Sequence, residues 1–86
     1  MENDFKIQKI TAFIAVDENG TEGVMGAQLG NTMMPLVCAD DIRVAKMFPI
    51  AEAIKHATGK DYKVLQFNSF IDVTKQTREL FKNQIL

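Results

Sequence analysis

Cys38 and His56 are the two residues of this chain whose side chains are best suited to covalent catalysis. A thiolate attacks electrophilic carbon and an imidazole can take its proton, but the two groups must lie within hydrogen-bond reach. Helical periodicity places His56 on the polar side of a predicted helix, opposite Met47, whereas strand alternation places Cys38 inside. A buried cysteine usually packs as a small apolar side chain. We therefore predict no catalytic residues and no enzymatic activity.

Carboxylates and glycines are the other groups that could bind a ligand. Residues 17–22 have the acidic character of a calcium loop, but the glycine stands fourth instead of sixth and strands, not helices, are expected to flank it. Asp40 and Asp41 are better suited to capping a helix, and the four ligands that zinc prefers are lacking. Phosphate-binding loops need glycines between a strand and a helix, whereas these glycines lie within or between predicted strands: Gly20, Gly23, Gly26 and Gly30. We predict no metal and no cofactor.

Composition limits the classes of partner. The 86 residues are 47% hydrophobic and 24% charged, which is typical of one globular domain, residues 1–86. The formal net charge of -1 provides no excess positive field for nucleic acid or an acidic membrane surface. One cysteine allows no internal disulfide, and neither a signal peptide nor an apolar run of roughly 20 residues is visible. We expect a cytoplasmic protein that binds neither nucleic acid nor membrane.

The dipeptide Asn19-Gly20 predicts a tight hairpin, because both central residues of a type I′ turn need positive φ. It would join a strand over residues 7–16 to a strand over residues 23–29. In a two-residue loop Ile14 faces Met25 and Ala12 faces Ala27. Alternation then places seven apolar residues on the core face and Phe13 and Val24 on the outer face: the seven are Ile10, Ala12, Ile14, Val16, Met25, Ala27 and Leu29.

Gly30-Asn31 predicts a second two-residue turn, leading into a third strand over residues 33–38. This register pairs Met34 with Ala27, Leu36 with Met25 and Pro35 with Gly26. Met34, Leu36 and Cys38 join the core face, and Met33 and Val37 fall on the outer face. Pro35 makes this an edge strand.

The second half predicts helix, strand and helix. Asp40 or Asp41 caps a helix that Gly59 ends, with a kink or break at Pro49. A fourth strand follows over residues 62–70 and a last helix over residues 75–84. The apolar stripe of the first helix comprises Val44, Met47, Ile50, Ala51, Ile54 and Thr58. The order β-β-β-α-β-α predicts an α+β fold with sheet order 3-2-1-4, strand four lying parallel beside strand one.

The outer sheet face carries more apolar residues than a solvated face needs, so we expect it to be covered by the last helix, a second copy or a ligand. The predicted interaction surface comprises Phe13, Val24, Met33, Val37, Leu80 and Phe81. The leading hypothesis is a non-enzymatic protein-interaction module that binds itself as a homodimer or another protein as an inhibitor or adaptor, such as an accessory protein of a phage or mobile element. The alternatives are a small-molecule or nucleotide binder, with a pocket between the sheet and the kinked helix, and a small enzyme built on Cys38 with His56 or an aspartate.

Overall fold

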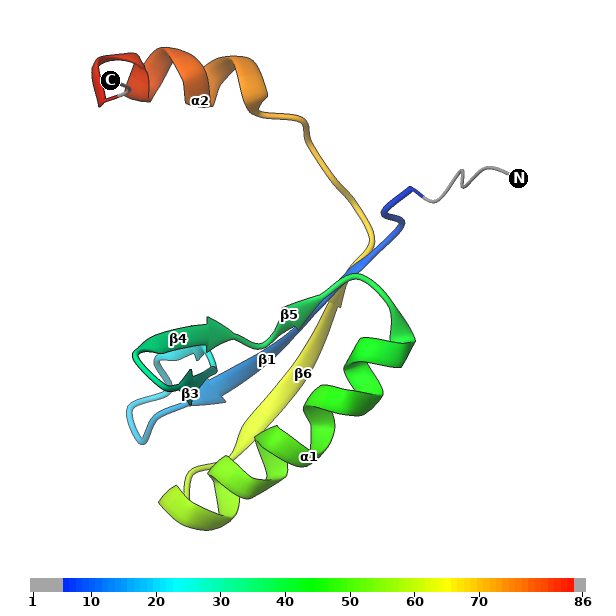
Figure 1. The fold of residues 1–86 in the computed structure, drawn as a ribbon, viewed down its shortest axis with the longest axis vertical. Coiled ribbons are helices and arrows are strands. Elements are labelled where there is room, and N and C mark those ends of the chain that lie inside the picture. Colours follow the sequence, from blue (N-terminus) through cyan, green and yellow to red (C-terminus); the bar gives the residue numbers. More distant parts are fainter. Residues whose placement is uncertain (1–5, 85–86) are drawn as a thin grey trace.

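The computed structural model describes residues 6–84, which form the α+β fold that the sequence predicts (Figure 1). Six strands, two α-helices and one 3-10 turn are present in this part of the chain. In chain order they are β1 Ile10–Val16, β2 Glu22–Val24, β3 Gly26–Leu29, β4 Thr32–Pro35, β5 Val37–Cys38, α1 Asp41–Thr58, β6 Tyr62–Phe67, α2 Thr74–Phe81 and η1 Lys82–Gln84.

β1 is the central strand of the main sheet, as its apolar content predicts. β6 runs antiparallel along one side of it, from Ile10 opposite Phe67 to Ala15 opposite Tyr62. Two short strands share the other side: β2 pairs with residues 14–16 and β5 with residues 11–12, both antiparallel. β2 and β5 are therefore two pieces of one interrupted edge strand.

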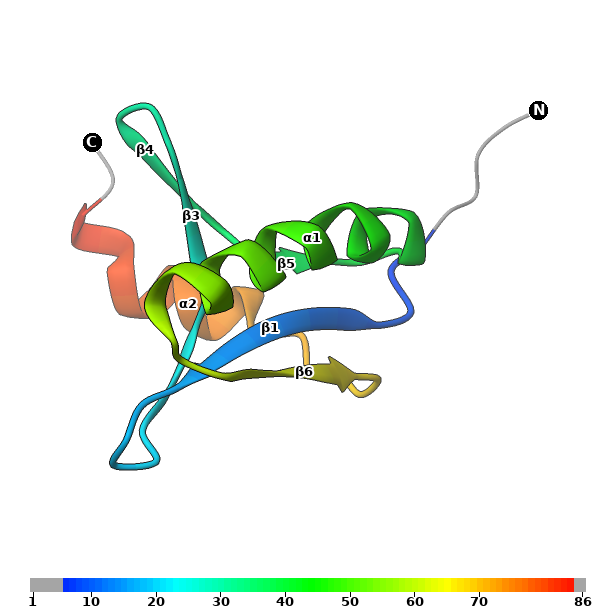
Figure 2. The same cartoon turned by 90° about the horizontal axis from the view of Figure 1, so that it is seen from below.

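The hairpin β3–β4 leaves the sheet at this interruption. Met25 N donates to Phe13 O, Leu36 N donates to Met25 O and Phe13 N donates to Leu36 O, at 2.8, 2.8 and 3.0 Å. These bonds satisfy the backbone where the chain departs at Met25 and returns at Leu36. The hairpin then rises on the same side of the sheet as α1 (Figure 2).

The first turn is one residue longer than the sequence predicts. Ile14 faces Val24, not Met25, and Asp17 N donates to Thr21 O around a three-residue loop. The Asp17 carboxylate accepts from the amides of Asn19 and Thr21, both at 2.8 Å, which favours this longer turn. Gly20 alone has positive φ there, at 83°, so the two-residue type I′ prediction is wrong.

The second turn is confirmed. Met34 lies opposite Ala27, Pro35 opposite Gly26, and Thr32 opposite Leu29 around Gly30-Asn31. Gly30 has φ of 61°, which a glycine adopts easily at the first central position of a tight hairpin loop.

The one-residue shift exchanges the two faces of β1, because side chains alternate along a strand. Phe13, predicted to face outward, is fully buried under α1, whereas Ala12 and Ile14 are buried on the opposite face between the flanking strands. Leu29, predicted in the core, is exposed near the hairpin tip. Met25, Ala27, Leu36 and Cys38 are buried as predicted, and the core cluster consists of Phe13, Met25, Ala27, Leu36 and Ala51.

α1 covers one face of the sheet with the stripe predicted for it, except that Thr58 at its end is exposed. Val44, Met47, Ile50 and Ile54 pack partly buried against the core around Ala51. Asp40 is the N-cap and accepts from Arg43 N at 2.8 Å, while Gly59 ends the helix with φ of 74°. The helix runs as one segment through Pro49, so the predicted break into two segments is absent.

The fourth strand of the prediction, β6, ends at Phe67 rather than residue 70 and runs antiparallel to β1, not parallel. A helical crossover joins parallel strands, and here it joins β5 to β6, which share one direction on opposite sides of β1. The prediction was wrong because it treated the strand before α1 as the third of a continuous meander. The hairpin instead returns the chain to β1 in the direction of β2.

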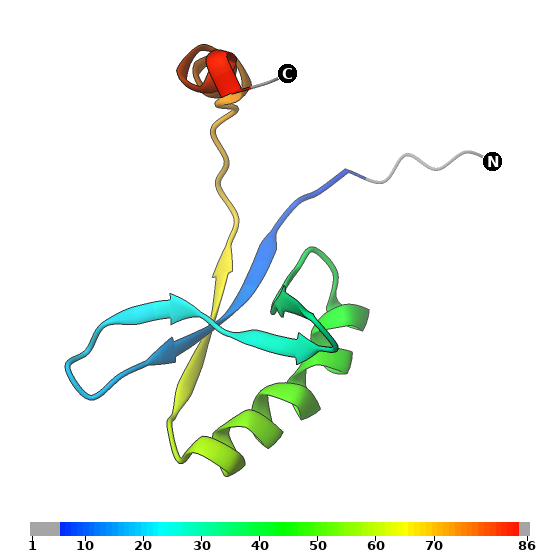
Figure 3. The same cartoon turned by 60° about the vertical axis from the view of Figure 1, so that its left-hand side comes forward.

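The chain beyond β6 stands apart from the domain (Figure 3). We call residues 68–84 the arm: an extended segment over residues 68–73, then α2 and η1. Every residue of the arm is exposed, and α2 packs substantially against η1 alone. The radius of gyration is 16.0 Å, against about 12 Å for a compact chain of this length. Within residues 6–84, no helix combines the length and apolar character needed to cross a membrane.

Candidate functional site

Cys38 and His56 are not brought together. Cys38 is buried at the end of β5, just before α1, whereas His56 is exposed near the other end of the helix. The rise of an α-helix separates residues 41 and 56 by about 22 Å along its axis. Burial raises the pKa of the Cys38 thiol above its ordinary value of 9.0, and the Asp40 carboxylate adds to this. The thiol is therefore held in its unreactive form at neutral pH.

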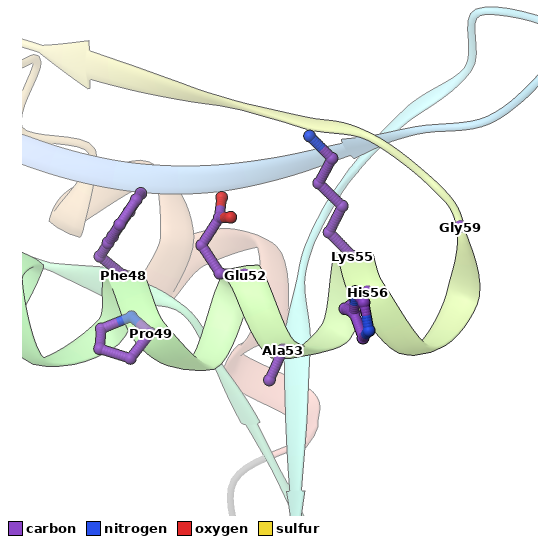
Figure 4. Close-up of a pocket in the computed structure, with 7 residues that line it drawn as sticks. All are labelled: Phe48, Pro49, Glu52, Ala53, Lys55, His56 and Gly59. Carbon is purple, nitrogen blue, oxygen red and sulfur yellow. The ribbon is translucent and has the colours of Figure 1, made fainter.

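A shallow depression of about 820 Å³ lies along the C-terminal half of α1 (Figure 4). Its side chains come from the helix alone, with Phe48, Glu52 and Lys55 on one side and Pro49, Ala53 and His56 on the other. Lys55 already forms an ion pair with Asp61 at 3.4 Å. This surface has no second wall opposite its polar groups, so it does not resemble an active site.

Tyr62 contacts a second polar group of that surface, the carboxylate of Glu52. Its hydroxyl donates to the Glu52 carboxylate at 2.5 Å, and its ring lies 6.0 Å from the Phe13 ring, centroid to centroid. Burial, followed by the hydrogen bond to Glu52, raises the pKa of Tyr62 to about 12. The contact ties β6 to α1 across the edge of the core, which is a structural role.

The acidic turn is also structural. The Asp17 carboxylate accepts two backbone amides of its own turn, and Glu22 forms an ion pair with Lys63 on β6. Glu22 lies opposite Val16 rather than Asp17, so these two carboxylates do not face one another. Among residues 6–84, no three His, Cys, Asp or Glu side chains are grouped to hold a metal ion.

The six residues predicted to form one interaction surface divide among four places. Phe13 lies in the core and belongs to no surface. Val24 and Val37 lie on the sheet face turned away from α1, because they pair with Ile14 and Ala12. The remaining three are exposed elsewhere, Met33 on the hairpin and Leu80 and Phe81 on the arm.

We call the sheet face turned away from α1 the open face. None of its residues belongs to the core cluster under α1, and several of its apolar side chains are at least one-third exposed. It comprises the apolar residues Ile10, Ala12, Ile14, Val16, Val24, Val37, Leu65 and Phe67, together with the ion pair of Glu22 and Lys63. Sequence reasoning missed the contribution of Leu65 and Phe67. Their alternation along β6 was a usable signal, but it needed the antiparallel register to be assigned to a face.

The arm exposes more apolar side chains than the two predicted for it. Phe70, Ile71 and Val73 precede α2 and are exposed by 51, 83 and 50%. Together with Leu80 and Phe81 they give an apolar segment that stays exposed and buries no residue within residues 6–84. The sequence places Phe70 in a predicted strand, and this assignment concealed its exposure.

A third apolar surface lies between the hairpin and α1. This hairpin groove has a volume of about 610 Å³ and is lined mostly by apolar side chains. Small residues form much of it, and Leu29 and Met33 stand at the hairpin side: the lining comprises Gly26, Ala27, Gln28, Leu29, Met33, Pro49, Ile50, Ala53, Ile54 and Ala57. The sequence suggests room for such a pocket beside Pro49 and the alanines at 45, 51 and 53; Pro49 and Ala53 line this groove, whereas Ala51 is fully buried in the core.

No protein-family model, curated protein or solved structure matches this chain.

Proposed function

We propose that this chain is a non-enzymatic protein-interaction module that binds a polypeptide through the open face and the arm. The observation that carries the proposal is the arm itself. It holds five large apolar side chains in solvent, and the open face of the sheet is uncovered as well. Exposed apolar surface of this extent typically marks a protein-binding site.

The polar residues support binding rather than catalysis. The carboxylates of Asp40, Asp17 and Glu52 each accept a hydrogen bond that holds a cap, a turn or a helix–strand contact. The only thiol is buried, with a raised pKa. In this proposal the chain binds the surface of another protein and acts as an inhibitor or adaptor. An accessory protein of a phage or mobile element is one example of such a module. A cytoplasmic location belongs to the same proposal, because a single cysteine forms no disulfide within the chain.

Affinity capture from the native host tests this proposal. The baits are the tagged wild-type chain, Val24→Asp on the open face and Leu80→Asp on the arm. Val24 and Leu80 are exposed by 52 and 73%, so a charge there leaves the core intact. Ile42→Asp is the matched control, because Ile42 is exposed by 71% on α1 and lies outside both surfaces.

A protein retained by the wild-type and control baits and lost from both surface variants is the expected result. Mass spectrometry identifies it, and recovery of the untagged chain itself counts as self-association. Equal recovery of every protein on all four baits contradicts the proposal.

The hairpin groove supports a second candidate function, the binding of a small apolar metabolite or nucleotide base. Its volume and apolar lining are those of ordinary ligand pockets. A thermal-shift screen against metabolites and nucleotides tests it, with Ala53→Trp to fill the groove and Ala45→Trp as an exposed control on the same helix. We expect a ligand that raises the melting temperature of the wild type and Ala45→Trp but not of Ala53→Trp. The absence of any such ligand rejects this candidate.

A further inference from the structure

We propose that two copies of this chain form a reciprocal dimer, in which the arm of each copy lies on the open face of the other. The inference rests on the proposed function and names its partner as a second copy. Each chain carries both halves of the contact, the apolar side chains of the arm and the apolar open face. A two-fold exchange satisfies both halves at once, as isologous interfaces do.

The segment that joins the arm to the domain favours exchange over folding back. To cover its own open face the arm must reverse direction directly after Phe67. Phe70, Ile71 and Val73 favour extended backbone, although Asn68 and Ser69, directly after Phe67, are residue types common in turns. The structure shows this segment extended, carrying α2 away from its own domain (Figures 1 and 3). Six extended residues reach roughly 20 Å, enough to cross to a neighbouring copy.

The exposed area is of the size that a stable dimer needs to bury. The chain exposes 7198 Å², whereas a compact protein of 9.7 kDa exposes about 5,100 Å². The excess is on the order of 2,000 Å² per chain, and standard interfaces bury about 1,200–2,000 Å² over both partners. Burial of part of this whole-chain excess on each of two copies is therefore enough for a standard interface, without opening either core.

The distribution of charge also favours binding of the arm to the open face. Residues 74–84 of the arm carry Lys75, Arg78 and Lys82 against a single carboxylate, Glu79. The open face ends at the acidic turn, where Asp17, Glu18 and Glu22 outnumber the two nearby lysines, Lys60 and Lys63, of which Lys63 pairs with Glu22. A basic helix on this face meets opposite charge at that end, which steers the arm to the open face. The hairpin groove, by contrast, is lined by no charged residue.

Complementation between two variants tests the exchange. Light scattering after size exclusion gives the mass of the wild type, Val24→Asp, Leu80→Asp and the Ile42→Asp control, with circular dichroism to verify folding. Val24→Asp changes the open face of both copies and Leu80→Asp changes the arm of both copies, so each variant alone is expected to be monomeric. In an equimolar mixture, the intact arm of a Val24→Asp chain can lie on the intact open face of a Leu80→Asp chain. We expect the mixture to regain the mass of two chains, and the wild type and the control to be dimers.

Other outcomes overturn the exchange. A dimeric wild type that Leu80→Asp leaves dimeric indicates direct pairing of open faces. A monomeric wild type whose melting temperature falls with Leu80→Asp indicates an arm folded back on its own domain. A monomeric wild type with unchanged stability also rejects the dimer. In that last case a host protein captured by wild type and lost from the variants preserves the proposed function, so the two failures remain distinguishable.

Discussion

Single residues in this chain act mainly by completing local contacts. Asp17 supplies acceptors to two turn amides, Asp40 caps α1, and Tyr62 joins β6 to the helix through Glu52. Most of these roles follow from residue type and neighbours along the chain, which is why the Asp40 cap and the Gly59 stop were predictable. The Tyr62–Glu52 contact links residues on different elements, and sequence reasoning did not find it.

Tyr62 gives a direct spectroscopic prediction, because it is the chain's single tyrosine and there is no tryptophan. We expect its ultraviolet absorbance to titrate with a midpoint near 12 in the native chain and near 10 in denaturant. The folded pKa is the higher one, so the unfolded chain loses its proton first. The free energy of unfolding therefore falls as pH rises from 10 towards 12.

Glu52→Gln removes the negative charge and is expected to lower that native midpoint to a value between 10 and 12, since burial still acts. Glu18→Gln, on the exposed turn, is the control and should leave the midpoint unchanged. A native midpoint near 10 in the wild type would contradict the contact.

At the scale of elements, secondary-structure features with a local sequence pattern were predicted correctly. The strand register failed where the length of one turn, a single residue, determined it. The stripe of α1, the hairpin register around Gly30 and the caps are confirmed. The turn at residues 17–21 holds one more residue than expected, and that residue reversed the faces of β1. The interaction surface was consequently predicted with Phe13 wrongly included and Leu65 and Phe67 omitted. The interruption at Met25 was not predicted, although Gly26 and Pro35, which pair at the base of the hairpin, are residue types that mark bends and edges in strands.

Substitutions in the first turn distinguish the observed loop from a type I′ loop. Gly20→Ala should lower the free energy of unfolding by about 1–2 kcal/mol, because Gly20 has positive φ. Asn19→Ala should change it by less than about 0.5 kcal/mol, since Asn19 has negative φ. Urea unfolding measures both, with Gly23→Ala as a control at ordinary φ. A large loss for Asn19→Ala would restore the two-residue loop.

The face of β1 that builds the core is tested in the same way. Phe13→Ala should cost about 3–5 kcal/mol, because the ring is fully buried in the core cluster. Val24→Ala, on the open face, should cost far less in the isolated chain, at a protein concentration where it is monomeric. Similar losses for the two variants would mean that the faces are assigned wrongly.

For the molecule as a whole, the domain provides the stability of the fold, whereas the arm is available for assembly with another chain. It contributes no buried residue to the domain, so its ordering depends on what it meets outside the chain. Segments with few buried contacts open at low free-energy cost and are the first to be cleaved.

Trypsin should therefore cut at Lys75 and Arg78 in the arm before it cuts at Lys46 or Lys63 in the domain when the protein is dilute. In a reciprocal dimer, raising the protein concentration buries the arm, so cleavage at Arg78 should slow while cleavage of the Leu80→Asp variant stays fast. Mass spectrometry of timed digests measures both rates. Concentration-independent cleavage of the wild type would contradict burial of the arm in a second copy.

The departure of the chain at Met25 has a use in protein engineering. Because Leu36 N donates to Met25 O, the edge strand beside β1 is complete without residues 26–35. Ala27 and Met34 pack in the core, so the replaceable segment is residues 28–33, held at its base by that pair. A foreign peptide spliced there would be displayed next to α1, its two ends already clamped at the spacing of paired strands.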